Sequence, residues 1–144
     1  MPTTEPIICP AIIFSDSVIR EQGTGKISII GSFTQFNFPS FPAACPPFVV
    51  TILLSRIPGP IEHLPLTVRI EAMGSANVLQ SMSGELHIQD NITINDVLEI
   101  TVPVPPTVFV QPGVYEVHVF IEGQPLNHRP LLVKSISTSP QISP

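Results

Sequence analysis

Proline most constrains what this chain can fold into, because 18 of its 144 residues are proline. A proline has no backbone N–H, so it interrupts the interior of a helix and is excluded from the middle of a sheet. The prolines fall in or beside the breaks between apolar runs, as at Pro39, Pro58, Pro112 and Pro125. No segment longer than about ten residues has apolar side chains at helical spacing. We therefore expect an all-β chain with no helix longer than about two turns.

Apolar and polar side chains alternate at period two in residues 64–72, 85–89, 98–102 and 114–122. This pattern predicts antiparallel strands with one buried face and one face in water. In the last of these segments the apolar set is Tyr115, Val117, Val119 and Ile121. Residues 48–54 (FVVTILL) are apolar at both parities instead. That segment should be central in a sheet or covered by a partner.

Residues 111–133 (QPGVYEVHVFIEGQPLNHRPLLV) contain two apolar runs separated by the turn residues Glu122, Gly123 and Gln124. The pattern is typical of a β-hairpin. With the other runs it gives about eight or nine short strands, which favours an antiparallel two-sheet sandwich of immunoglobulin-like or jelly-roll type. We expect a single domain over residues 1–134 and a C-terminal tail over residues 135–144.

The chain is poor in charge: 43% of its residues are hydrophobic and only 12% are charged, against about 25% charged in an average domain. No run approaches the 18 apolar residues of a membrane-spanning helix, so we expect no membrane insertion. The net charge of −5 and six scattered Lys and Arg residues argue against nucleic-acid binding. The N-terminus has no basic residue before its apolar run, unlike a secretory signal, which favours a cytoplasmic protein.

The two cysteines, Cys9 and Cys45, precede prolines and are 36 positions apart. We expect two reduced, buried thiols. A disulfide between neighbouring strands is the alternative. A metal site would require more soft ligands than these two positions supply.

Two patterns in the sequence invite a chemical interpretation. Residues 23–26 (GTGK) do not have the spacing of a phosphate-binding loop, because Arg20 and Ile27 occupy positions that need Gly and Ser or Thr. A hairpin turn is expected there. His87 and His118 lie on predicted wet faces. They could meet across a sheet and recruit Glu85 or Glu116 for a metal, although solvated surface histidines are the simpler interpretation.

No arrangement of a nucleophile, base and orienting group is evident in the sequence. We therefore expect no enzyme activity, no cofactor and no catalytic or metal-binding residue.

Four of the eight phenylalanines lie close together in FTQFNFPSF. They are Phe33, Phe36, Phe38 and Phe41. Alternation along one strand would put Phe36 and Phe38 on one face and Phe33 on the other. The four rings either pack into the core under a proline-rich loop or form an aromatic contact surface for a partner chain. We name them as the candidate interface. Carbohydrate stacking is a weaker interpretation, because the chain has no Trp and one Tyr.

Asp16 and the segments GTGKISIIGSF (23–33), FPSFPAACPPFVV (38–50) and PGVYEVHVFIEGQPL (112–126) together form a recognisable pattern. It resembles an uncharacterised family of small bacterial domains of unknown function, over roughly residues 8–134. The resemblance implies an immunoglobulin-like β-sandwich and supplies no catalytic residues.

The sequence therefore favours a non-enzymatic structural or protein-interaction module that self-associates or binds a protein partner. The alternative is a small-ligand or carbohydrate-binding module, which would require a concave polar pocket with an exposed aromatic side chain.

Overall fold

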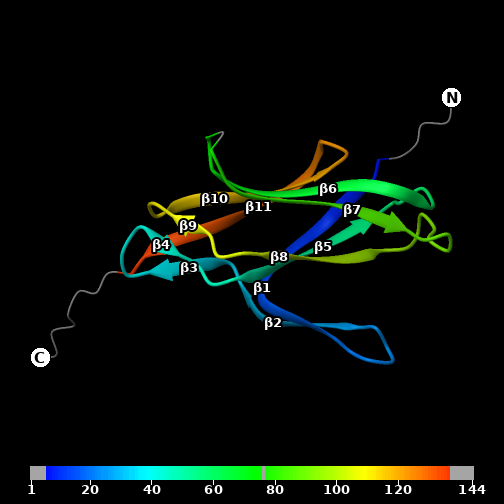
Figure 1. Cartoon of the computed structure of the whole chain (residues 1–144), viewed down its shortest axis with the longest axis horizontal. Coiled ribbons are helices and arrows are strands. Elements are labelled where there is room, and N and C mark those ends of the chain that lie inside the picture. The colour runs from blue at the N-terminus through cyan, green and yellow to red at the C-terminus, as the bar shows by residue number, and fades with distance from the viewer. Residues whose placement is uncertain (1–5, 76, 137–144) are drawn as a thin grey trace, which may run out of the picture.

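The computed structural model describes residues 6–75 and 77–136. These residues form eleven β-strands, and no helix occurs among them (Figure 1). The all-β prediction is confirmed. No helix in the described ranges is long and apolar enough to cross a membrane.

Four antiparallel strands form the first sheet in the order β2-β1-β5-β8. Their bounds are β1 (Ile8–Arg20), β2 (Ile27–Phe33), β5 (Phe48–Ser55) and β8 (Leu98–Val104). The first half of β1 pairs with β5 and its second half pairs with β2. Strand β5 is thus an inner strand, as the apolar residues at both of its parities predicted.

Five strands form the second sheet in the order β3-β11-β10-β6-β7. Their bounds are β3 (Gln35–Phe38), β6 (Ile61–Ala72), β7 (Val78–Ile88), β10 (Gly113–Ile121) and β11 (Gln124–Ser135). Strands β10 and β11 form the predicted hairpin. Strand β3 runs parallel to β11, so this sheet is mixed rather than antiparallel. The cause is the crossing at Thr34, where the chain leaves the edge of one sheet and joins the edge of the other.

A third, two-stranded sheet pairs β4 (Ala43–Ala44) with β9 (Val108–Phe109). The expected count of eight or nine strands was therefore too low. Two-residue strands are too short to show any alternation, and the alternation of Phe33, Phe36 and Phe38 does not mark where β3 begins. Both errors concern segments in which proline and phenylalanine, rather than period two, dominate the sequence.

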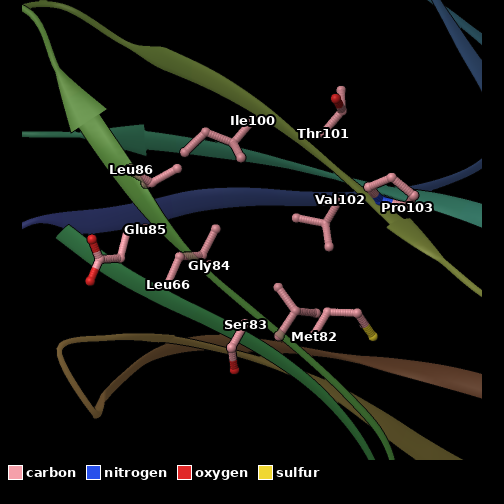
Figure 2. A pocket seen from close by; sticks show the side chains of 11 residues that line it. Leu66, Met82, Ser83, Gly84, Glu85, Leu86, Ile100, Thr101, Val102 and Pro103 are labelled. Carbon is pink, nitrogen blue, oxygen red and sulfur yellow. The ribbon is translucent and has the colours of Figure 1, made fainter. Parts of the chain in front are cut away.

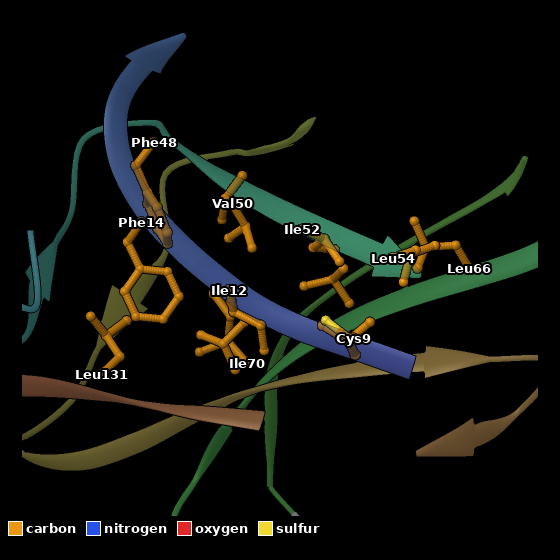
Figure 3. Packing of buried hydrophobic residues seen from close by; sticks show 14 of the residues in the cluster. Cys9, Ile12, Phe14, Phe48, Val50, Ile52, Leu54, Leu66, Ile70 and Leu131 are labelled. Atoms are coloured by element: carbon orange, nitrogen blue, oxygen red, sulfur yellow. The ribbon is translucent and has the colours of Figure 1, made fainter. Parts of the chain in front are cut away.

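One buried cluster takes its side chains from both larger sheets (Figure 3). Phe14, Val50 and Ile52 of the first sheet and Val68, Ile70 and Leu131 of the second are all fully buried. The four predicted inward residues of β10 are also buried, at 5% exposure or less. Each such side chain contributes roughly 1.5–3 kcal/mol through removal from water. Both larger sheets thus contribute to one buried core.

Polar side chains of β11 close one flank of this core against β1. The Asn127 amide donates a hydrogen bond to the Cys9 carbonyl oxygen (2.8 Å), and the Arg129 guanidinium donates one to the Ile12 carbonyl oxygen (2.7 Å). The same guanidinium lies 4.6 Å from the centre of the Phe14 ring. These contacts span the two sheets, so this flank is held shut.

The C-terminal tail predicted for residues 135–144 lies outside the described residues from position 137 onward. Ser135 is the last residue of β11, and the Ile136 amide donates a hydrogen bond to the Phe38 carbonyl oxygen (2.9 Å).

Candidate functional site

The opposite flank, between β7 and β8, is open. Here the edge strand of the second sheet faces the edge strand of the first, and a groove of about 270 Å³ lies between them (Figure 2). Most of its lining is aliphatic and includes Leu66, Met82, Leu86, Ile100 and Val102. Its lining includes no aromatic side chain.

Strand β7 has a glycine at an inward-facing position of the groove wall. Gly84 pairs with Leu66 of β6, between Met82 and Leu86 on the same face. A Cβ atom added at Gly84 would have no heavy atom within 4 Å. The missing side chain leaves a notch in an otherwise apolar wall, open to a side chain from outside.

The register of β7 against β6 shifts between Gln80 and Val78, but the strand lacks the prolines and basic residues that often protect the edge of a sheet. Edge strands are usually short or carry Lys, Pro or a bulge that discourages pairing with another chain. Strand β7 has 11 residues and contains no Pro, Lys or Arg. Strand β8 across the groove carries Pro103. A strand could therefore add more readily to β7 than to β8.

A second exposed feature is the hairpin formed by the end of β1 and by β2, which we call the arm (residues 16–32). It extends away from the rest of the molecule (Figure 1). None of its side chains is buried, and within the described chain β2 pairs with β1 alone. A two-stranded hairpin without packing partners is marginally stable in water.

The arm is nevertheless apolar on both faces. Val18 is opposite Ile29 on one face, and Ile27 follows on that same face. Ile19 and Ile30 occupy the other face, at 53% and 43% exposure. Five β-branched apolar side chains on a protruding hairpin form an exposed patch of the kind that marks an interaction site.

The tip of the arm is the GTGK segment, and it forms a turn as predicted. The Glu21 amide donates to the Lys26 carbonyl oxygen (2.8 Å), and the Arg20 guanidinium donates to the Gly25 carbonyl oxygen (2.7 Å). A helix N-terminus, which a phosphate-binding loop requires, does not follow it.

The four candidate phenylalanines are half-buried and pack against the core cluster. Their ring centres form a continuous series, with 4.7 Å from Phe33 to Phe36, 5.7 Å to Phe38 and 6.0 Å on to Phe41. These separations are those of favourable aromatic pairs. Phe33 was expected on the face opposite Phe36, but the chain crosses between sheets after Phe33, so the two rings meet. Their role at an interface stays a prediction.

The histidines do not meet in the predicted way. His87 Nδ1 lies 3.4 Å from the Glu62 carbonyl oxygen, and Glu85 pairs with His63 (2.9 Å). His118 instead stacks on His128, with ring centres 5.1 Å apart.

Two carboxylates accompany this histidine pair on the outer face of the second sheet. His118 Nε2 lies 3.4 Å from Glu71 and 3.6 Å from Glu116, and His128 Nε2 lies 3.3 Å from Glu116. Across residues 6–75 and 77–136, no three or more His, Cys, Asp or Glu side chains are arranged to hold a metal ion.

Cys9 and Cys45 are buried and not bonded to each other, which confirms the prediction of free thiols. Burial raises the pKa of both thiols. A raised pKa keeps the thiol protonated and unreactive at neutral pH.

The sequence did not reveal the groove, because it depends on which strands lie at the two sheet edges. The only local signal was Gly84 within an alternating run.

A family model matches residues 10–134, and its description is a family of unknown function (DUF6941). No curated protein matches the sequence. Among solved structures, the chain is similar to the Pseudomonas fluorescens alkylpurine DNA glycosylase AlkC bound to DNA containing an abasic site analogue. The identity is 16% and the TM-score is 0.44. The match covers 70% of this chain and 28% of that one.

Proposed function

This chain belongs to the family of unknown function DUF6941, and we propose that it is a non-enzymatic structural module that self-associates. The observation that carries the proposal is the arm, whose apolar side chains on both faces are half-buried or exposed and never fully buried. Removing such side chains from water is favourable at roughly 25 cal/mol per Å². An arm of this kind gains stability only when it lies against another protein surface.

Two further observations support association with protein rather than with another ligand. Strand β7 is a long sheet edge without Pro, Lys or Arg, and it borders an apolar groove. Backbone N–H and C=O groups at such an edge are positioned to pair with another strand. The groove lining is aliphatic, and so suits side chains of a protein partner.

The fold we propose for this module is a two-layer sandwich of immunoglobulin-like or jelly-roll type. In support, one buried cluster joins the four-stranded and five-stranded sheets. A module of this kind leaves its sheet edges available for contacts with neighbouring copies.

Sedimentation equilibrium over a hundredfold range of concentration tests the proposal. We expect the average mass to rise above the 15.6 kDa of one chain as the concentration increases. A single mass of 15.6 kDa at every concentration would overturn the proposal.

A further inference from the structure

We infer that the copies join head to tail, with the arm of one copy lying in the β7/β8 groove of the next. This inference rests on the proposed self-association and specifies its contacts. Strand β2 of the arm would pair with the free edge of β7 and extend the second sheet of the neighbouring copy. The side chains of β2 that face inward would then enter the groove.

The apolar side chains of the arm match this placement. On β2, Ile27 and Ile29 lie on one face, two positions apart, and Val18 of β1 lies opposite Ile29. In a strand added beside β7, residues two positions apart point to the same face of the sheet. Ile27 and Ile29 can therefore enter the groove together, and the notch at Gly84 leaves room for one of them.

The two strands that would pair, β2 and β7, are both outer strands of their sheets. Strand β2 is the outer strand of its own sheet, just as β7 is the outer strand of the other sheet. Among the described residues, neither strand pairs with another strand along its outer side, and neither contains proline. Their pairing would satisfy both edges at once.

Charge is complementary between the tip of the arm and the surroundings of the groove. Arg20 and Lys26, at the tip, are two of the six Lys and Arg residues of the chain, and they outnumber the one acidic residue of the tip, Glu21. The groove is lined by Glu85, which lies 2.9 Å from the imidazole of His63, and the exposed Glu99 precedes its β8 wall. The whole stretch of residues 70–128 contains no Lys or Arg. An occupant with a basic tip is therefore favoured over an acidic one.

This contact joins two different surfaces, so each copy keeps a free arm at one end and a free groove at the other. A heterologous contact of this kind produces rings when the rotation closes and open filaments when it does not. It also makes the two surfaces separable by mutation.

Two variants each remove one surface. Ile27→Ser with Ile29→Ser removes the inserting face of the arm. Gly84→Val fills the notch without a backbone penalty, because φ at Gly84 lies outside the left-handed region. The matched control is Ile19→Ser with Ile30→Ser, which removes two isoleucines from the opposite face of the same arm.

Sedimentation velocity of these proteins, alone and mixed, tests the inference. Each arm or groove variant alone should be monomeric, whereas the control should assemble like the natural chain. An equimolar mixture of the arm and groove variants should form a 1:1 dimer of about 31 kDa and nothing larger, because only one arm and one groove remain functional (twice 15.6 kDa).

Circular dichroism confirms that each variant is folded before it is scored. A natural chain that assembles while the mixture stays monomeric would overturn the inference and leave self-association intact. Assembly of either variant on its own would overturn it as well. A monomeric natural chain would overturn both proposals.

Discussion

Replacing Gly31 with alanine should destabilise the base of the arm by two separate effects. Gly31 has φ of +68°, a left-handed conformation that costs a residue with a Cβ atom about 1–2 kcal/mol. The new Cβ would also lie 2.8 Å from Cγ of Asp16, which is opposite Gly31 across the β1–β2 pair. Moving that carboxylate off its rotamer costs about 0.5–1.5 kcal/mol. The sum is a loss of about 1.5–3.5 kcal/mol in the free energy of unfolding.

Gly25 provides a matched control within the same hairpin. Its φ is +71°, and an added Cβ would meet no heavy atom within 4 Å. Gly25→Ala should therefore cost only the backbone part, about 1–2 kcal/mol. The difference between the two variants measures the crowding by Asp16.

Urea unfolding at a protein concentration low enough to keep the chain monomeric gives these free energies. In an Asp16→Ala background only the Cβ of residue 16 would remain close to the new Cβ, at 3.1 Å, so Gly31→Ala should cost less than in the natural chain. Crowding would be refuted if Gly31→Ala cost the same in both backgrounds. The whole argument would be refuted if Gly31→Ala changed stability by less than about 0.5 kcal/mol.

Three further predictions concern the core and its closed flank. Arg129→Met should lower the free energy of unfolding in urea by about 1.5–3 kcal/mol, because a charge-assisted hydrogen bond across the sheets is lost. The exposed control Lys134→Met should leave the free energy of unfolding unchanged. An equal loss of stability in the two variants would contradict this prediction. Thr51 is fully buried, and its hydroxyl has no hydrogen-bond partner among the described residues. Thr51→Val should therefore raise the free energy of unfolding by about 1–3 kcal/mol. A decrease would show that the hydroxyl is hydrogen-bonded. Burial raises the folded-state pKa of the Cys9 and Cys45 thiols above the unfolded value of about 8.5. The stability they contribute is therefore complete below about pH 8.5 and is lost as the pH rises through their folded pKa. Between pH 7 and pH 10.5, the free energy of unfolding should fall less steeply with pH in a double Cys→Ala variant than in the natural chain. Identical dependence on pH in the two proteins would contradict the raised pKa of the thiols.

Local alternation was enough to predict the β-class, the β10–β11 hairpin and the inner position of β5. These features depend on period two and on turn residues within a single segment, which a sequence shows directly. The inward faces of β6 and β10 followed from the same pattern.

Features set by contacts between distant segments could not be predicted. The parallel pairing of β3 and the meeting of Phe33 with Phe36 both follow from the crossing at Thr34, where no turn residue such as Gly or Pro appears. His118 meets His128 because β10 and β11 are neighbours, whereas β6 lies between His118 and the strand that carries His87.

The groove was missed for a similar reason. Gly84 is one glycine in an otherwise ordinary alternating strand, and it lines a groove only because β7 and β8 are the outer strands of their sheets. The sequence indicated one property of the arm, because residues 27–30 (ISII) have apolar side chains at both parities. That β2 lies at an edge, away from the core, is a property of the sheet order.

Disulfide trapping between two chains that carry different cysteine substitutions tests the arm-to-groove contact most directly. One chain carries Ile29→Cys and the other carries Gly84→Cys, and the natural Cys9 and Cys45 are buried and slow to react. Mild oxidation of the mixture should give a covalent heterodimer, whereas a chain with Ile136→Cys in place of Ile29→Cys should give none. Equal trapping of the Ile136→Cys chain, or no heterodimer from the Ile29→Cys chain, would contradict head-to-tail assembly through the arm.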